Sequence, residues 1–142
     1  MATRSAIGLV EYDGTVTGIY CHWDGYLEQV GRKLFENYTD LEKVVELLEL
    51  GDLSSLGKEI GHKHPFSPSY ASEMTYEEYY RDYGHMCVSY SRDRGDGCPA
   101  LVFKDINEFK QYYPECDFLY MFDGISWTYA DRFTDGFVAL KF

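Results

Sequence analysis

Several features that would identify a known chemistry are missing from this chain of 142 residues. No long apolar run follows the N-terminal segment, so we expect neither a signal peptide nor a membrane-spanning helix. The four cysteines are widely scattered and form no Cys-x-x-Cys pair, which argues against a zinc site. No serine-nucleophile motif is present. We therefore expect a cytoplasmic protein with reduced thiols, no metal and no cofactor.

Basic residues are also few, because 13 Lys and Arg stand against 24 Asp and Glu, for a formal net charge of −11. An acidic surface repels the phosphate backbone, so we do not expect direct binding of nucleic acid. Two interpretations of the charge stay open. It can keep a tyrosine-rich protein in solution, or it can complement the nucleic-acid channel of another protein.

The length and the aromatic content of the chain are sufficient for a hydrophobic core. Its length fits a single domain spanning 1–142, and a content of 18% aromatic residues argues against disorder. β-favouring residues flank the dipeptides Asp13-Gly14 and Asp123-Gly124, which suit tight hairpin turns. Segments with apolar residues at helical spacing lie between these hairpins. The pattern predicts the α+β class, with a mostly antiparallel sheet built from hairpins and helices packed on one face.

Local signals place the elements of the first half more closely. The first hairpin should span Ser5 to His22, and a helix should begin within two residues of Gly25 with Asp24 as its N-cap. Residues 53–72 break into Gly, Ser, His and Pro, a long irregular connection of the kind that is often functional. A short helix or ordered lid rich in tyrosine should follow at 75–83.

The nine residues from Gly18 to Tyr26 gather polar-tipped rings at the end of a predicted strand. Each buried ring N–H or O–H must find a partner, so a strand that only fills a core does not need so many of them. Strand alternation places Tyr20 and His22 on one face and turns Cys21 toward the core. The segment therefore predicts part of a surface site.

The turn that follows this strand extends the candidate ligand-binding set. Trp23 and Tyr26 can stack on a planar group, and Asp24 can accept hydrogen bonds from a base or a ribose. In the alternative interpretation, the two rings fasten a helix to the sheet and Asp24 only caps that helix. His22 beside Asp24 also has the composition of a general base with its orienting carboxylate, but neighbours two apart need a specific turn to meet. We assign no catalytic residue.

Two arginines in a Gly-rich turn complete the set. Arg92 and Arg94 can bind an anion, because a planar guanidinium forks onto phosphate oxygens. Asp93 and Asp96 lie beside them in the sequence, so internal ion pairs are the alternative use.

Two segments carry a resemblance. Residues 14–56, with GTVTGIYCHWDGYLEQVGRKL, an acidic helix and LGDLSSL, resemble a family of small uncharacterised proteins of tailed phages and prophages. The stretch LYMFDGISWTYAD at 119–131 resembles it more loosely. The resemblance implies a phage origin and action in the cytoplasm of the host cell, but no particular activity. Phage accessory proteins of this size often disarm host defences.

These observations lead to two hypotheses and a weaker third. We expect a counter-defence protein that binds and sequesters a nucleotide-derived host immune signal without turnover. The alternative is an acidic inhibitor that presents Glu42, Glu46 and Glu49 on a helix to a host nuclease, polymerase or restriction/CRISPR complex. An enzyme that degrades such a signal is the third. The expected partner is thus a nucleotide-like small molecule or a host defence protein, without a membrane, and homo-oligomerisation stays open.

Overall fold

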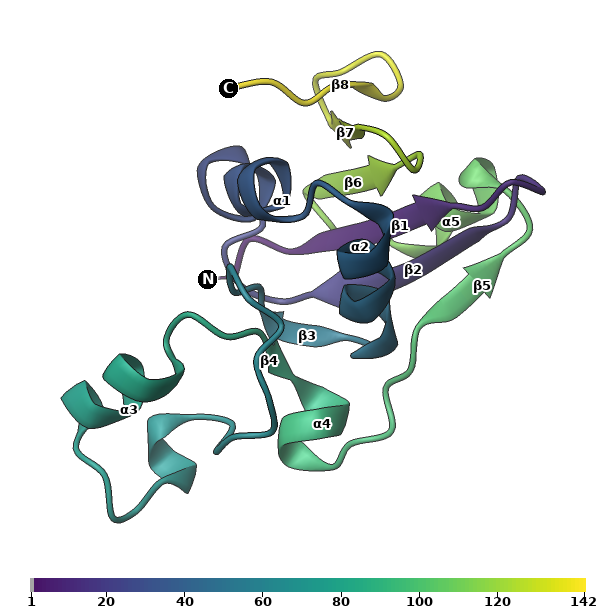
Figure 1. Ribbon diagram of the computed structural model, residues 1–142. Helices are drawn as coiled ribbons and strands as arrows, with labels where there is room; N and C mark the ends of the chain where they lie inside the picture. Colours follow the sequence, from purple (N-terminus) through teal and green to yellow (C-terminus); the bar gives the residue numbers. More distant parts are fainter. Residues whose placement is uncertain (1) are drawn as a thin grey trace.

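The fold is built around an eight-stranded mixed sheet whose central strands come from the first hairpin (Figure 1). The computed structural model describes residues 2–142. Its strands are β1 (Ser5–Val10), β2 (Val16–Cys21), β3 (Leu53–Ser55), β4 (Val88–Ser89), β5 (Leu101–Phe103), β6 (Phe118–Phe122), β7 (Trp127–Asp131) and β8 (Val138–Ala139). Its helical segments are η1 (Leu27–Gly31), α1 (Arg32–Asn37), α2 (Leu41–Glu49), η2 (Pro68–Tyr70), α3 (Tyr76–Tyr83), α4 (Tyr90–Arg94) and α5 (Ile106–Tyr112).

The strand order is β4-β3-β2-β1-β6-β7-β8, and β5 shares the outer edge of β2 with β3. Both hairpins that the Asp-Gly dipeptides predict are present, as β1–β2 and β6–β7. They are joined side by side through a parallel pairing of β1 with β6. A second parallel contact links β2 to β3, and the remaining pairs are antiparallel. The α+β class and the mostly antiparallel sheet are therefore confirmed.

Helices cover both faces of this sheet. On one face, Ile7 and Ile19 pack against Leu34 of α1 and Leu47 of α2. On the other face, the α5 residue Phe109 lies against strand positions that carry small side chains. A Cβ at Gly18 would stand 2.6 Å from the Phe109 ring, so glycine is required for this close approach. The expected placement of helices on one face thus describes α1 and α2 but not α5.

The chain turns sharply between β2 and the first helical segment. The π-helical turn η1 begins at Leu27, within two residues of Gly25 as predicted. Asp24 is not its N-cap, because the cap position is Tyr26. Asp24 instead adopts a left-handed φ of 58°, and its carbonyl oxygen accepts a hydrogen bond from the backbone N–H of Val30.

Residues 56–87, which connect β3 to β4, form an arm that projects from the sheet and carries η2 and α3 (Figure 1). The predicted tyrosine-rich helix at 75–83 is confirmed as α3, where Thr75 and Glu78 form a capping box. At the base of the arm, the Tyr38 hydroxyl donates to the Gly57 carbonyl over 2.7 Å, and Cys87 N–H donates to the Glu59 carbonyl. The irregular connection predicted at 53–72 is therefore wrong in part, because β3 and η2 lie within it.

Candidate functional site

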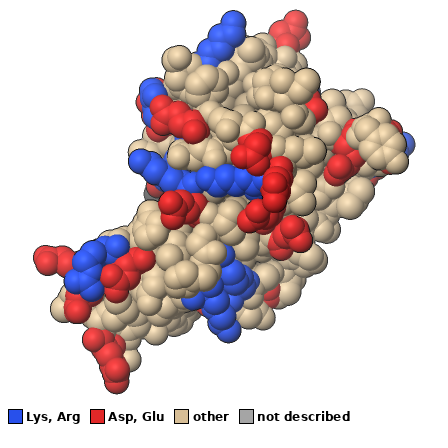
Figure 2. All heavy atoms as spheres, in the orientation of Figure 1, with Lys and Arg blue, Asp and Glu red and all other residues tan. Residues whose placement is uncertain are grey.

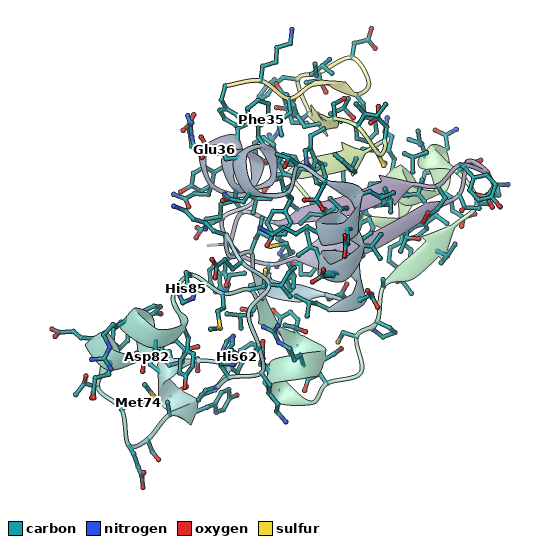
Figure 3. All side chains as sticks on the ribbon, viewed as in Figure 1. Phe35, Glu36, His62, Met74, Asp82 and His85 are labelled. Carbon is teal, nitrogen blue, oxygen red and sulfur yellow. The ribbon has the colours of Figure 1, made fainter. Side chains whose placement is uncertain are left out.

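A cleft of about 470 Å³ lies between the end of β2 and the arm. Figure 3 shows the arm standing apart from the sheet, with Met74 and Asp82 on its outer part and His85 where it returns. Five aromatic rings line the cleft: Trp23 after β2, and Phe66, Tyr79, Tyr80 and Tyr83 of the arm. Among residues 2–142, the charged side chains in its lining are Asp24 and Lys33. Rings from two separate segments of the chain thus meet around one space.

The position of Trp23 is fixed by its backbone and by a neighbouring ring. Its backbone N–H donates to the Ser54 carbonyl over 2.9 Å, which continues the pairing of β2 with β3 beyond Cys21. The His22 ring meets the indole edge-on, with ring centroids 4.7 Å apart. Trp23 nevertheless remains 45% exposed. The indole thus contacts His22 and lines the cleft while a large part of the residue is accessible to a ligand.

Tyr20 and His22 lie on one face of the strand, as the alternation predicts, and Cys21 is fully buried in the core. The Tyr20 hydroxyl and His22 Nδ1 are hydrogen-bonded over 2.8 Å. Burial raises the pKa of Tyr20 to about 12. Neither ring lines the cleft; this pair supports Trp23 from the side.

The segment offers no nucleophile with its base among the described residues. His22 Nδ1 bonds to Tyr20, and no hydrogen bond joins His22 to Asp24. Burial raises the pKa of the Cys21 thiol to about 12, which keeps it protonated at neutral pH. Tyr26 is partly exposed and does not line the cleft. Of the five residues predicted from this segment, the structure therefore places Trp23 and Asp24 in the cleft.

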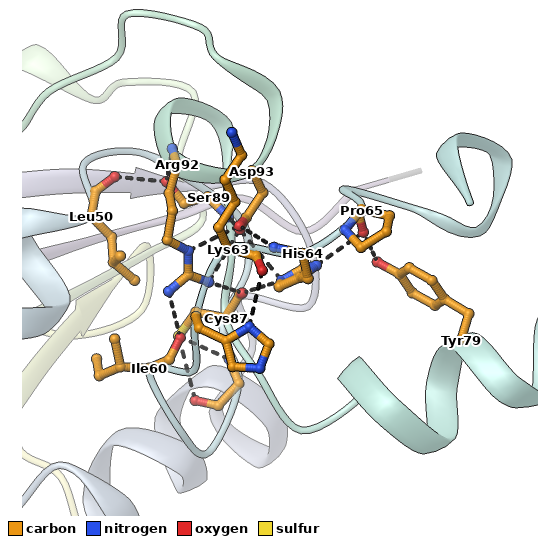
Figure 4. A network of polar contacts seen from close by, with 12 residues as sticks. Leu50, Ile60, Lys63, His64, Pro65, Tyr79, Cys87, Ser89, Arg92 and Asp93 are labelled. Carbon is orange, nitrogen blue, oxygen red and sulfur yellow. Dashed lines mark hydrogen bonds and ion pairs between the residues drawn. The ribbon is translucent and has the colours of Figure 1, made fainter. Parts of the chain in front are cut away.

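Arg92 is engaged inside the molecule (Figure 4). Its Nε and Nη2 donate to the Asp93 carboxylate, Nη1 donates to the Ile60 carbonyl, and Nη2 also donates to the Cys87 carbonyl. Only 18% of its side chain is exposed. Arg92 thus connects α4 to the base of the arm rather than facing a ligand.

Arg94 is also paired within the chain. Its guanidinium lies 2.7 Å from Asp96 and over the rings of Phe66 and Tyr90, at 4.5 and 4.9 Å from their centroids. The alternative that both arginines form internal ion pairs is therefore confirmed. Neither arginine lines the cleft, although Arg94 stacks on Phe66, one of the rings that do.

His64 and Asp93 form the buried anchor of the arm (Figure 4). The Asp93 carboxylate accepts hydrogen bonds from the backbone N–H groups of His64 and Ser89. The His64 ring contacts the carbonyls of Pro65 and Cys87 through its two nitrogens, over 2.9 and 3.0 Å. Both side chains are fully buried. This network ties the chain before α3 to the chain after it.

The sequence interpretation missed the aromatic wall that the arm supplies. The spacing of Tyr76, Tyr79, Tyr80 and Tyr83 predicted the helix, but not which segment its rings would face. Two features of the sequence could have indicated that the arm forms part of a binding site: the tyrosine content of this segment and the length of the connection before it.

In residues 2–142, the His, Cys, Asp and Glu side chains form no group of three suited to hold a metal ion, and all four cysteines are free. No helix in this range combines the length and apolar character that crossing a bilayer requires. Comparison with protein families, with curated proteins and with solved structures finds no match for this chain.

Proposed function

We propose that this protein is a phage-encoded counter-defence protein that sequesters a nucleotide-derived host immune signal in the cleft between Trp23 and the arm. The observation that carries the proposal is the aromatic lining, five rings around about 470 Å³. Ligand sites of small molecules are typically concave, mostly apolar and roughly 300–1,000 Å³ in volume. Aromatic side chains bind bases by stacking, because every base has a planar face.

The lining supports binding without turnover. No His, Cys or Glu is among the residues that line the cleft. The lining does contain three serines, Ser54, Ser55 and Ser67. None of them has a histidine in the lining that could act as its general base, and the lining contains no cysteine nucleophile. The place of action in the host cytoplasm belongs to the same proposal and rests on the resemblance to phage proteins.

Isothermal titration against cyclic dinucleotides and cyclic ADP-ribose isomers tests the proposal directly. Replacing Trp23 with alanine should weaken binding by about tenfold or more, because stacking on one aromatic side chain stabilises a bound base by about 1–3 kcal/mol. Tyr12→Ala is the matched control, since that ring is fully exposed at the β1–β2 turn and does not line the cleft. Absence of heat with every such ligand would reject the proposal.

Trp23 also offers a second readout. The other tryptophan, Trp127, is buried and donates from its ring N–H to the Tyr38 carbonyl, so it gives a steady background fluorescence. A ligand in the cleft should quench the Trp23 emission, and the quenching should be absent in the Trp23→Phe variant.

The acidic inhibitor remains the second candidate because of α2. Glu42, Glu46 and Glu49 are exposed, and none of them forms an ion pair within residues 2–142. Figure 2 shows acidic side chains gathered over this helix beside a band of basic ones. Leu41 and Val45 are exposed on the same helix. A mixed acidic and apolar surface of this kind suits a basic protein partner.

A further inference from the structure

A second, shallow hollow of about 560 Å³ adjoins the aromatic cleft. The two spaces share Lys33, Tyr80 and Gly84 in their linings, so they adjoin at these residues. The remaining lining of the hollow consists of Gly57, Lys58, Arg81 and His85. A ligand that stacks in the cleft can therefore extend past Lys33 into the hollow.

The lining of this hollow is basic in a strongly acidic chain. Four of its seven lining residues are Lys, Arg or His, and none is Asp or Glu, whereas the chain as a whole has a net charge of −11. The local charge is thus opposite in sign to that of the molecule. An anion is attracted here although the rest of the surface repels it.

Two of these basic groups already have a carboxylate neighbour. Arg81 pairs with Asp82 over 2.9 Å, and His85 Nε2 lies 3.6 Å from the Glu59 carboxylate. All four of these side chains are substantially exposed, so solvent screens both pairs. The Arg81 guanidinium therefore remains available to an entering anion, and the His85 ring offers a further N–H donor.

The two lysines are less engaged. Lys33 Nζ donates one hydrogen bond to the Leu56 carbonyl over 3.2 Å, and an ammonium group has three N–H donors. Lys58 is exposed and forms no ion pair among the described residues. Lys33 stands at the junction of the two spaces, within the lining of both.

We propose that the basic hollow binds the phosphate of a ligand whose base stacks in the aromatic cleft, with Lys33 between the two parts. This inference rests on the proposed function and narrows its ligand class to nucleotides, as opposed to nucleosides and other uncharged planar molecules. Asp24, the only acid in the cleft lining, disfavours a phosphate at its end of the site. The charges thus orient the ligand as well as attract it.

Matched pairs of simple probes test the inference by isothermal titration: adenosine against adenosine 5′-monophosphate, and guanosine against guanosine 5′-monophosphate. We expect the nucleotide of each pair to bind about tenfold more tightly than the nucleoside, as one or two charge-assisted hydrogen bonds would give. Raising the salt concentration should reduce this difference.

Variants then locate the phosphate. The double variant Lys33→Gln, Lys58→Gln should bring nucleotide and nucleoside to nearly equal affinity. Lys58→Gln alone alters only an exposed side chain and should remove part of the difference, which guards against a folding defect in the double variant. Lys104→Gln, at an exposed lysine outside both linings, is the control and should change neither affinity.

The outcomes separate the two proposals. Equal affinity of the wild-type protein for nucleoside and nucleotide, with both weakened by Trp23→Ala, would overturn the phosphate site and leave the aromatic site standing. A preference for nucleotides that persists in the double variant would also overturn the phosphate site. Absence of binding by all four probes and by the cyclic ligands would reject both proposals.

Discussion

Asp52 is the residue whose ionisation most directly affects the strand end that carries the site. It precedes β3, and its Oδ1 accepts the backbone N–H of Tyr20 over 2.9 Å. Along this edge of β2, β5 pairs with Val16–Gly18 and β3 pairs with Cys21. The bond from Tyr20 to Asp52 lies between these two paired stretches. Burial raises the pKa of the Asp52 carboxyl above its usual value of 3.8, although the Tyr20 N–H opposes this shift.

The raised pKa predicts a pH dependence of stability. As the pH rises from the ordinary value toward the raised one, the unfolded chain releases the Asp52 proton first, so the free energy of unfolding falls through this window. Asp52→Asn keeps an oxygen that can accept the Tyr20 N–H, so this contribution should vanish and the variant should be the more stable one above the window. The difference between variant and wild type in urea unfolding, measured from about pH 3 to about pH 7, tests this expectation.

Asp135→Asn, at an exposed position, is the control and should give a difference that does not vary in this way. A stability difference for Asp52→Asn that stays constant with pH would contradict the assignment.

The sequence predicted the orientation of residues in the candidate site only where the chain forms a strand. Alternation along β2 correctly assigned the faces of Tyr20, Cys21 and His22. It could not continue past Asp24, because a residue with φ of 58° ends the strand period and redirects the chain. Tyr26 lies outside the cleft lining, and the N-cap assigned to Asp24 was wrong.

At the scale of elements, the arm depends on its buried anchor. Replacing Asp93 with alanine leaves the buried His64 and the partly buried Arg92 without their carboxylate, and breaking a buried pair typically costs about 3–5 kcal/mol. We expect the arm to open locally, with faster hydrogen exchange of α3 amides than of β1 and β2 amides. Ligand affinity should fall in parallel, because the arm supplies four of the five rings of the cleft.

The matched control is Asp96→Ala, which removes an exposed partner of Arg94 and should leave the exchange of α3 unchanged. Equal acceleration of exchange in α3 and in the β1–β2 hairpin would show global destabilisation instead of release of the arm.

The helix α2 distinguishes the two candidate functions. Its glutamates do not line the aromatic cleft or the basic hollow, so reversal of Glu42, Glu46 and Glu49 to lysine should leave nucleotide affinity within about twofold at physiological salt. A basic protein partner would instead associate more slowly with the reversed protein, since steering by charge is lost. Biological activity of the triple variant in infected, defence-bearing cells therefore decides between sequestration and inhibition.

Elements that depend on local sequence were predicted, and those that depend on distant partners were not. The Asp-Gly hairpins and α3 carry their signals in adjacent residues, as turn dipeptides and a capping box. Arg92 and Arg94 lie in α4 where the sequence predicted a Gly-rich turn. The buried Asp93 of this helix accepts hydrogen bonds from Ser89 of β4 and from His64 of the arm, and neither contact has a local sequence signal. The parallel pairing of β1 with β6 joins segments more than a hundred residues apart and leaves no local pattern.

At the scale of the whole molecule, the negative net charge gives no indication of the positive charge that gathers at the basic hollow. A total of −11 argued against binding of nucleic acid, and this expectation concerns an extended phosphate backbone. A single phosphate needs only a few cations, which the fold draws from α1, the base of the arm and α3. Composition does not reveal such a gathering, because Lys33, Lys58 and Arg81 are far apart in the sequence.

The way in which the arm joins the sheet has an evolutionary consequence. The chain leaves β3 and re-enters at β4, its antiparallel neighbour, and Glu59 pairs with Met86 just beyond the two strands. An insertion whose two ends lie side by side can be exchanged for another without moving the rest of the sheet. The side of the cleft that carries Trp23 belongs to the sheet, and the opposite side belongs to the exchangeable segment, residues 56–87. Replacing the arm alone would then change which ligands the cleft binds, while the end of β2 that carries Trp23 stays the same.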